Sequence, residues 1–409
     1  MYFNKIIRDL KKPMVIEKKN ICPNCAMSEM KIFYEAINVP INSCIMFSNH
    51  EEAISFPRGD VILGFCSSCG FISNVAFDSK KIDYSTLAPE EQSSSSTFNA
   101  FANRLANRLI ETYGIKKKKI LEIGCGRGDF LALLCKLGKN QGVGIDPSII
   151  TGDLKDPNPN DLQFIRDYFS KKYFDYVNDL VCCRHTLEHI FETVQFIENI
   201  RESIQNRLET VSFFEVPDVT RILKEVAFWD IYYEHCSYFT LGSLARLFRL
   251  CNFEIEYLSK DYFDQYLLID LKPVTRKSKK ILNVEESIEV TTKNVLDFSA
   301  NSKQKIGTWK NILRKIKEEQ KKAIVWGSGS KCVGFMTTLD VHDEIEFIVD
   351  INPLRHGKFI PGVGKQILSP DFLRTYKPDV VIVMNPVYLE EIQQDLCKMN
   401  LFPKLIPCS

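Results

Sequence analysis

The sequence predicts an α/β protein with two doubly wound sheets, preceded by a small cysteine-rich module. Three observations support this: two C-x-x-C pairs lie near the N-terminus, and strand–glycine-turn–helix patterns begin at Lys119 and at Ala323. Short apolar strands that alternate with helical segments are typical of parallel sheets with right-handed crossovers. A chain of 409 residues has room for two or three domains. We expect them at residues 1–84, 85–262 and 263–409.

Composition and charge exclude several classes of protein. The chain is 45% hydrophobic and 26% charged, with a net charge of +1, so it has no electrostatic footprint for nucleic acid. No apolar run approaches the roughly twenty residues that cross a bilayer, and the first residues do not resemble a signal peptide. We therefore expect a cytoplasmic protein, monomeric or homodimeric, that acts on a small molecule rather than on a membrane or nucleic acid.

The two C-x-x-C pairs predict a structural zinc site. They are Cys22 with Cys25 and Cys66 with Cys69, in a large chain with fourteen cysteines and no leader. Four thiolates complete a tetrahedral shell around Zn²⁺, which leaves no vacancy for a substrate. A redox C-x-x-C is the alternative, but neither pair follows the strand-then-helix pattern of such a motif. Short apolar segments between the pairs favour the strands of a zinc-ribbon-like module.

The strongest motif is the stretch 119–128, which reads Lys-Ile-Leu-Glu-Ile-Gly-Cys-Gly-Arg-Gly. Glu122 lies in the apolar run, Gly124 and Gly126 follow it, and a second apolar run ends in Asp146. Glycines let the backbone approach a ligand, and a carboxylate about twenty residues later can accept ribose hydroxyls. The pattern resembles motif I of the class I S-adenosylmethionine (SAM)-dependent methyltransferases, which implies SAM as cofactor. The alternative is an ordinary glycine-rich βα turn.

The alternation of strands and helices continues on both sides of this motif. The expected helices are 98–110, 130–137 and 285–320, and the further expected strands are 162–167, 180–183, 211–216, 323–326, 345–350 and 378–386. Asp167 ends the third strand, and an acid there meets the adenine in similar methyltransferases. Ligands of such a sheet lie beyond the C-terminal ends of its strands. The second sheet lacks the acid and the three alternating glycines, so the two do not read as tandem copies.

Two segments concentrate ionisable and aromatic residues, namely 183–190 and 229–239. Three of the six histidines fall in them, among them His189 and His235. An imidazole can move a proton near neutral pH, and an adjacent carboxylate such as Glu234 can orient it. The L-E-H-I segment around His189 often only lines the cofactor pocket. A purely structural role is less attractive for the second segment, because its run of polar side chains is costly to bury.

The order of these features resembles the sugar C-methyltransferase family, which methylates a ring carbon of nucleotide-linked 4-keto-deoxysugars. The resemblance covers nearly the whole chain. It rests on the cysteine pairs, Leu121-Glu-Ile-Gly124, the L-x-H-I segment with His189, Phe214-Glu-Val-Pro217, Tyr232-x-Glu234-His235 and Gly327-Ser-Gly329. It implies a zinc-binding N-terminal module, a class I methyltransferase domain and a C-terminal Rossmann-like domain.

The resemblance also implies roles for individual residues. His235 would remove the proton α to the keto group, and Glu234 and Tyr232 would orient it and stabilise the enolate, with His189 nearby. The C-terminal glycines would help to close the cleft over the nucleotide-sugar.

The chain departs from the family pattern at two positions. Sugar-methylating members carry Y-x-x-x-Y-x-x-x-Q, and here Tyr84 and Gln92 fit but Ala88 replaces the second tyrosine. Glu188 before His189 is also unlike many of them. The alternatives are an O- or N-methyltransferase of the same architecture, acting on a surface-polysaccharide or secondary-metabolite sugar, and a non-catalytic zinc- and nucleotide-binding scaffold.

Overall fold

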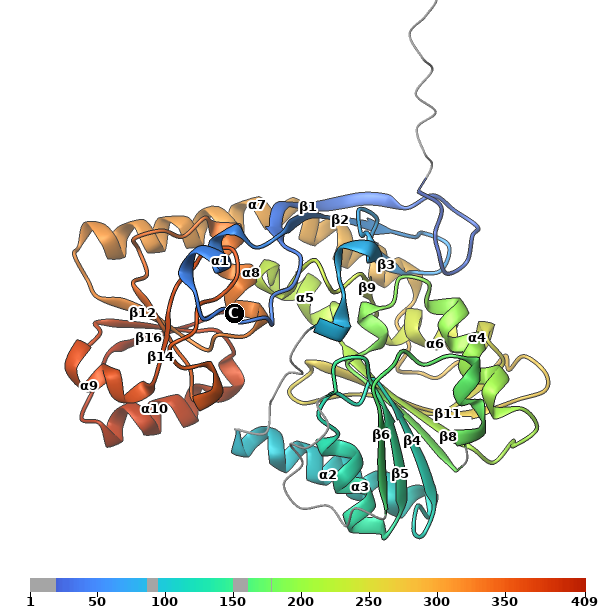
Figure 1. Cartoon of the computed structure of the whole chain (residues 1–409). Helices are drawn as coiled ribbons and strands as arrows, with labels where there is room; N and C mark the ends of the chain where they lie inside the picture. The colour runs from blue at the N-terminus through green and yellow to red at the C-terminus, as the bar shows by residue number, and fades with distance from the viewer. Residues whose placement is uncertain (1–19, 87–94, 150–160, 178) are drawn as a thin grey trace, which may run out of the picture.

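A computed structural model of the chain describes residues 20–86, 95–149, 161–177 and 179–409. These residues form three sheets, of four, seven and five strands, with helices packed around them (Figure 1). The expected α/β class with two Rossmann-like sheets is therefore confirmed. No helix in the described parts of the chain is long and apolar enough to traverse a bilayer.

The N-terminal sheet is antiparallel and has the order β1-β2-β3-β9. Its elements are β1 (Lys31–Pro40), α1 (His50–Ser55), β2 (Arg58–Phe65), β3 (Ile72–Asn74) and β9 (Ser237–Tyr238). Because β9 comes from the middle of the sequence, this sheet is not closed within residues 1–84. In Figure 1 the strands β1 and β2 run across the top of the molecule beside the long helix α7 (Ile288–Glu318).

The central sheet has the order β10-β11-β8-β7-β4-β5-β6. Its strands are β4 (Lys119–Ile123), β5 (Gln141–Ile145), β6 (Leu162–Ile165), β7 (Leu180–Arg184), β8 (Val211–Pro217), β10 (Phe253–Asp261) and β11 (Tyr266–Pro273). The first five are parallel, as expected, whereas β10 and β11 form an antiparallel hairpin on β8. The predicted boundary at 262/263 falls in the turn of this hairpin. It is too early, because β11 completes the central sheet.

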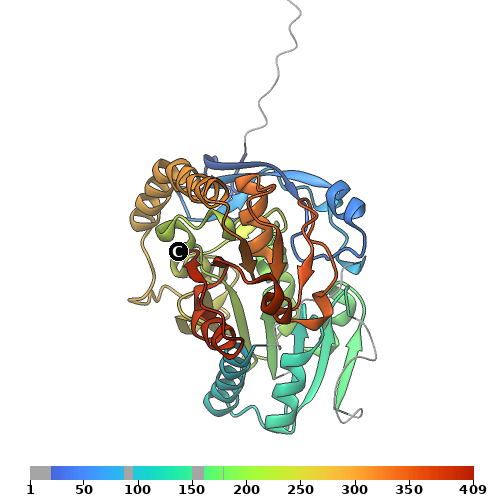
Figure 2. The same ribbon diagram turned by 90° about the vertical axis from the view of Figure 1, so that its left-hand side faces the viewer.

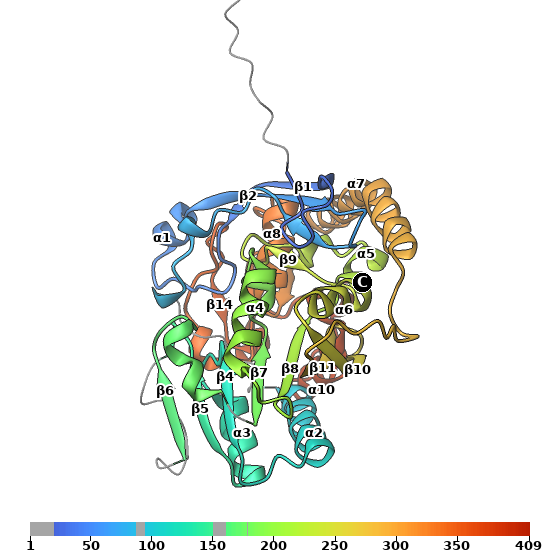
Figure 3. The same cartoon turned by 90° about the vertical axis from the view of Figure 1, so that its right-hand side faces the viewer.

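Helices cover both faces of the central sheet (Figure 3). They are α2 (Ser96–Tyr113), α3 (Asp129–Gly138), α4 (Thr193–Ile204) and α6 (Leu241–Leu250), whereas α5 (Val219–Glu225) belongs to the core that β1 shares with α7. Side chains of α2 and α3 pack with Ile120 and Phe213, whereas those of α4 and α6 pack with Leu121 and Phe214. Successive strand residues point to opposite faces of a sheet, so each adjacent pair serves both helical layers. This explains why the strands read as continuous apolar runs.

The C-terminal sheet is wholly parallel and has the order β14-β13-β12-β15-β16. Its elements are β12 (Ala323–Trp326), α8 (Ser330–Leu339), β13 (Phe347–Val349), β14 (Ile367–Leu368), α9 (Leu373–Tyr376), β15 (Val380–Val383), α10 (Leu389–Lys398) and β16 (Lys404–Pro407). Figure 2 shows this domain from the side of the C-terminus. One apolar core contains Tyr34 of β1, Trp229, and Phe335 of α8, so the N-terminal sheet packs directly on the C-terminal domain.

Short 3-10 turns carry several of the residues discussed below. They are η1 (Ser79–Lys81), η2 (Tyr84–Thr86), η3 (Lys171–Tyr176), η4 (Leu187–His189), η5 (Phe228–Asp230), η6 (Pro353–Arg355), η7 (Pro370–Phe372) and η8 (Pro386–Tyr388). Of these, η4 follows β7 and η5 precedes β9. Only η4 lies where the chain leaves the C-terminal edge of the central sheet, whereas η5 packs against α8 of the C-terminal domain.

Candidate active site

The loop after β4 has the backbone geometry that the glycine motif predicts. Gly124, Gly126 and Gly128 have φ values of 69°, 52° and 82°, in the left-handed region that side chains disfavour. A Cβ at Gly124 would overlap the Thr186 side chain. The loop therefore lies directly against the segment that follows β7.

Asp146, at the end of β5, holds this loop in place. Its Oδ2 accepts a hydrogen bond of 2.9 Å from the Gly126 N–H, and its Oδ1 accepts bonds from Ser148 N at 2.7 Å and Oγ at 2.6 Å. An ionised carboxylate offers about four lone-pair sites. Asp146 thus keeps capacity for one further donor, as the binding of a ribose hydroxyl requires.

Asp167, just after β6, lies at the same edge of the sheet. Its Oδ2 accepts from Tyr173 Oη at 2.6 Å and pairs with the ammonium of Lys172. Lys172 and Tyr173 lower the pKa of Asp167 to about 2, so the carboxylate is ionised at neutral pH. The structure thus brings Asp146 and Asp167, both predicted to bind the cofactor, to the same edge of the central sheet.

Glu122 is a buried carboxyl group within β4, with 2% of its surface exposed. Its Oε2 has no hydrogen-bond partner among the described residues, and burial raises its pKa to about 8. A buried polar atom without a partner is costly. The amino-acid end of SAM offers hydrogen-bond donors, so the acid, the glycine loop and Asp146 fit such a molecule.

The two histidines expected in the active site lie together. His189 ends η4 and His235 precedes β9, and their ring centroids are 4.8 Å apart in an edge-to-face arrangement. The Tyr232 ring lies 4.6 Å from that of His235, and Tyr84 Oη lies 3.2 Å from His189 Nδ1. Residues distant in sequence thus form one aromatic and imidazole cluster.

The hydrogen bonds of His189 define which of its nitrogens carries hydrogen. Its Nδ1 lies 3.0 Å from the backbone carbonyl oxygen of Glu234. A carbonyl only accepts, so Nδ1 donates and carries the proton. Nε2 is then the nitrogen whose protonation can change.

His235 is half-buried, and its pKa differs from the near-neutral value that we expected. Burial, reinforced by the neighbouring His189, lowers the pKa of His235 to about 3. The imidazole is therefore neutral over the whole physiological range and can accept a proton. As a base it is weaker than an exposed histidine.

Glu234 does not take the position expected of an orienting carboxylate. Its Oε1 accepts from the backbone N–H of Ser43 at 2.9 Å and also from the Ser43 hydroxyl. Only the backbone carbonyl of Glu234 reaches the histidine pair, through His189. Ser43, which lies in the loop after β1, was missed because nothing in its local sequence points to a partner 191 positions away.

Tyr232 is linked through Asp230 to a charged group of the C-terminal domain. Its hydroxyl donates to Asp230 Oδ1 at 3.0 Å, and Asp230 Oδ2 lies 3.4 Å from the ammonium of Lys331 at the start of α8. Lys331 also donates to Gln265 Oε1 at 2.8 Å. The C-terminal domain therefore contributes a charge to the edge of the cluster, which sequence reasoning did not foresee.

The four cysteines of the two C-x-x-C pairs also come together. Cys22 and Cys69 have their Sγ atoms 3.6 Å apart, Cys25 and Cys66 have theirs 3.5 Å apart, and all four lie within 4.8 Å of one another. Sulfur atoms around a tetrahedral zinc ion, with bonds of about 2.3 Å, lie roughly 3.8 Å from one another. The four thiols are therefore a suitable donor set for Zn²⁺.

Comparison with known proteins agrees with this geometry. Residues 97–258 match the family described as "Methyltransferase domain", and residues 269–400 match the family described as "C-methyltransferase C-terminal domain". The chain therefore has the two domains of a C-methyltransferase. It is a SAM-dependent methyltransferase. The C-methyltransferase NovU of Streptomyces niveus is 23% identical over 307 residues, which cover 71% of each chain.

Among solved structures, this C-methyltransferase is similar to N,N-8-amino-8-demethyl-D-riboflavin dimethyltransferase from Streptomyces davawensis. The TM-score is 0.34 and the identity 16%, over 43% of this chain and 56% of that one. Magnesium protoporphyrin IX methyltransferase from Synechocystis, with bound SAH, gives a TM-score of 0.34 and 12% identity, over 43% and 84% of the two chains.

The C-terminal domain of the C-methyltransferase repeats the loop-and-carboxylate arrangement of the central domain. Asp350 Oδ2 accepts from Ser328 N at 2.8 Å, and its Oδ1 accepts from Asn352 N at 2.8 Å. Gly327, which precedes this loop, has a φ of 103°. In both sheets an aspartate after one strand therefore holds the loop after the neighbouring strand, although the glycine patterns of the two loops differ.

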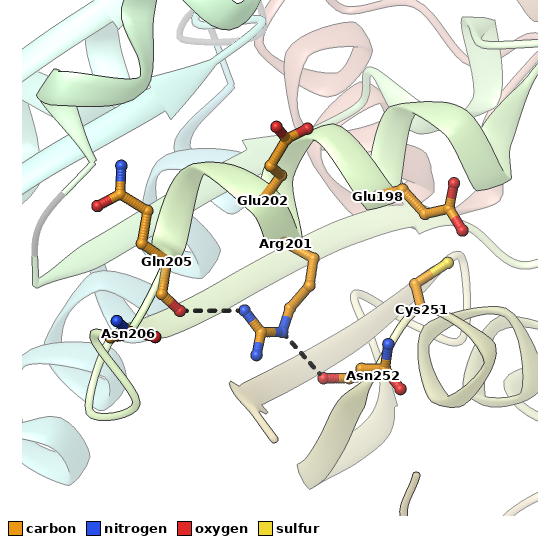
Figure 4. Close-up of a pocket in the computed structure, with 7 residues that line it drawn as sticks. All are labelled: Glu198, Arg201, Glu202, Gln205, Asn206, Cys251 and Asn252. Atoms are coloured by element: carbon orange, nitrogen blue, oxygen red, sulfur yellow. Dashed lines mark hydrogen bonds between the residues drawn. The ribbon is translucent and has the colours of Figure 1, made fainter. Parts of the chain in front are cut away.

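A hollow of about 480 Å³ lies away from these residues, between the end of α4 and the turn before β10 (Figure 4). Arg201 crosses it and donates to the backbone carbonyls of Gln205 and Asn252. Each guanidinium bond there satisfies a carbonyl at an element end. None of its lining residues belongs to a motif, and we assign it no catalytic role.

Proposed function

We propose that this C-methyltransferase methylates a ring carbon of a nucleotide-linked keto-deoxysugar through an enolate. The observation that carries the proposal is the neutral, half-buried imidazole of His235, packed against His189 and Tyr232. Methylation of carbon needs a base that creates a carbanion. Methylation of a hydroxyl oxygen depends less on such a base. The match of residues 269–400 and the C-methyltransferase NovU support transfer to carbon.

In the proposed reaction His235 takes the proton from the carbon α to the keto group. The C–H electrons move towards the carbonyl, the oxygen becomes an enolate, and the proton stays on the imidazole. SAM, when bound, supplies the electrophilic methyl group that the carbanion attacks. Glu122, Gly124, Gly126, Asp146 and Asp167 would hold it, with the glycines at its amino-acid end and Asp146 at its ribose.

Two tyrosines are candidates for the donor that stabilises the enolate. Tyr232 already donates its hydroxyl hydrogen to Asp230, so that hydrogen is committed in the absence of substrate. Because His189 Nδ1 carries a hydrogen, it cannot accept one from Tyr84, and the O–H hydrogen of Tyr84 stays available. We therefore favour Tyr84 as the oxyanion donor and Tyr232 as the side chain that packs the base.

We also propose Zn²⁺ at Cys22, Cys25, Cys66 and Cys69. The support is the closed set of four sulfur atoms within 4.8 Å of one another. With every coordination position filled by sulfur, the ion stabilises the fold and takes no part in methyl transfer.

An O- or N-methyltransferase of the same architecture is the second candidate. It is favoured by Ala88, which stands where sugar-methylating relatives carry a tyrosine. Ala88 and Gln92 lie outside the described residues. In such an enzyme His235 would deprotonate a hydroxyl or an amine, and no carbon acid would be involved.

Isotope exchange separates the two candidates. The protein is incubated in D₂O, without SAM, with a panel of nucleotide-linked 4-keto-6-deoxysugars, and exchange α to the ketone is followed by NMR. We expect exchange with at least one sugar for the wild-type protein and none for His235→Gln. Methyl transfer to a sugar without any α exchange would support the O- or N-methyltransferase instead.

A further inference from the structure

Glu188 is a buried carboxylate beside the proposed base that the mechanism has not yet used. It lies in η4 with 2% of its surface exposed, and its Oε2 has no hydrogen-bond partner among the described residues. One of its carboxylate oxygens and ring nitrogens of His189 and His235 all lie within 4.8 Å of one another. Such an atom is costly to bury unless a partner appears during the reaction.

A chain of alternating charges runs from Glu188 away from the histidine pair. Glu188 Oε1 lies 3.4 Å from His185 Nδ1, and His185 Nε2 lies 2.7 Å from Glu215 Oε1. Arg184 donates two hydrogen bonds of 3.0 Å to the carboxylate of Glu215. Positive and negative groups therefore alternate from Arg184 to Glu188.

This chain keeps Glu188 ionised. Burial alone would lower the pKa of His185, but Glu215 and Glu188 raise it to about 9. Burial alone would raise the pKa of Glu188, but His185 holds it below its ordinary value. At neutral pH an imidazolium thus faces a carboxylate, and the carboxylate faces the histidine pair.

The backbone at His185 shows that the fold constrains this geometry. His185 has a φ of 47°, which is rare for a residue other than glycine. Its ring packs edge-on against Tyr266, with centroids 4.6 Å apart. The strained backbone and the ring contact direct the imidazole between Glu215 and Glu188.

We propose that Glu188 is the electrostatic partner of the base and stabilises the imidazolium that His235 becomes when it takes the substrate proton. The inference rests on the proposed role of His235. The C–H bond breaks, the new N–H bond forms on His235, and Glu188 stays ionised. Glu188 is thus a positioning residue, in the role that the sequence assigned to Glu234.

Several titratable groups face His235, and their contributions differ in sign. His189 and His185 disfavour its protonation, whereas Glu188 and Asp230 favour it. Among the acids Glu188 has the larger effect, because Asp230 is already paired with Arg221 and Lys331. Loss of the Glu188 charge should therefore make His235 a weaker base.

A divalent cation is the other occupant that Glu188, His189 and His235 can hold. The imidazolium of His185, 3.4 Å from Glu188, opposes a second positive charge there. We therefore favour electrostatic stabilisation of the His235 imidazolium by Glu188 over a metal ion at this position. Assays with and without EDTA test this choice.

The test compares Glu188→Gln with the matched variant Glu234→Gln, which removes a second buried carboxylate, one that bonds Ser43 rather than the histidine pair. Exchange α to the ketone is measured across pH on whichever keto-sugar the wild-type protein labels. For Glu188→Gln we expect the maximal exchange rate to fall by roughly 10- to 10³-fold. We expect the acid limb of the profile to move to lower pH, with KM and SAM affinity near wild type. Glu234→Gln should not move the acid limb.

A double variant, His185→Gln with Glu188→Gln, guards against misfolding because it leaves neither partner as an unpaired buried charge. It should also exchange more slowly than wild type, since the charge with the larger effect on His235 is lost. Wild-type rates and an unmoved acid limb in both variants would overturn the inference. A loss of exchange in the wild-type protein on EDTA treatment, restored by added Mg²⁺ or Mn²⁺, would overturn it as well. If the wild-type protein labels no sugar, it is the proposed function that fails.

Discussion

The carboxylate of Asp146 connects a single residue to cofactor binding, because it ties down the loop that its ligand must approach. Without it the Gly126 N–H and the Ser148 N–H would lose their acceptor. Hydrogen bonds to a charged acceptor contribute about 1.5–3 kcal/mol each. Removal of the carboxylate should therefore lower the affinity for SAM more than it lowers the stability of the fold.

We expect Asp146→Ala to bind SAM at least roughly 10-fold more weakly, since one charge-assisted bond corresponds to a factor of that order. Isothermal titration calorimetry measures the affinity, and circular dichroism checks that the protein is folded. Asp350→Ala is the matched control, because Asp350 holds the equivalent loop of the other sheet. Equal SAM affinities for the two variants would remove Asp146 from the site.

His235→Gln should abolish methyl transfer while the melting temperature and SAM affinity stay near wild type. The imidazole has a pKa of about 3, so its replacement by a neutral amide removes no charge from the folded protein at neutral pH. Loss of a general base costs about 10²–10⁴ in rate. Early melting together with lost SAM binding would instead mark His235 as a packing residue.

The pKa of His185 predicts a dependence of stability on pH. Its value rises from 6.5 to about 9 on folding, so its stabilisation is complete below pH 6.5 and is lost as the pH rises through 9. Because a pKa difference of one corresponds to about 1.4 kcal/mol, the contribution is on the order of 3 kcal/mol. Urea unfolding of the wild type and His185→Gln should therefore differ most below pH 6.5 and converge above pH 9.

Substitution of the exposed His342 by Gln is the control for this experiment, since its side chain is 72% exposed. It should follow the wild-type curve at every pH. A difference between wild type and His185→Gln that does not change between pH 6 and 10 would show that His185 is not protonated on folding.

At the scale of elements, the two C-x-x-C pairs, here called the cysteine knuckles, do not form a unit separable from the rest of the fold. Phe71 beside the second knuckle packs against Phe239 with ring centroids 5.5 Å apart, and Arg246 of α6 donates to the Cys69 carbonyl at 2.8 Å. Cys22 and Cys66 belong to the same apolar core as α4 and α6. Disturbance of the knuckles should therefore reach the helices on that face of the central sheet.

Removal of the metal should show this coupling. We expect one zinc per chain by elemental analysis, and less in Cys66→Ser. Hydrogen exchange in that variant should rise over residues 20–75 and also over α6, because structural zinc contributes folding free energy directly. Cys397→Ser, at an exposed cysteine, is the control. A metal-free wild-type protein with four reactive thiols would refute the zinc site.

The elements that the sequence predicts well are those with a strong local signal. The strands β4, β7 and β8 are recognisable as apolar runs, because nearly all of their residues are buried on both faces of the sheet. The hairpin β10–β11 was missed because its strands lie between two recognised motifs, and their antiparallel pairing on β8 depends on tertiary structure. The glycine loop and Asp146 were found by spacing. Ser43 and Lys331 reach the cluster only through tertiary contacts, which no local pattern records.

For the whole molecule, the N-terminal sheet is what joins the parts. Its strands share one core with α8 and η5, and the knuckles share another with the central sheet. Further contacts link the two Rossmann-like domains directly, such as the 2.6 Å contact between the hydroxyls of Tyr262 and Tyr388. The expected three-domain order therefore describes the sequence better than it describes the packing.

The pairing of β9 with β3 has a practical consequence for protein engineering. Ser237 and Tyr238 lie in the N-terminal sheet although the sequence places them in the methyltransferase domain. His235 is separated from that strand by a single residue. A chimaera that exchanged only the cysteine-rich segment with a relative would leave β9 beside a foreign strand, and the histidine would move with it. A working exchange has to carry both segments together.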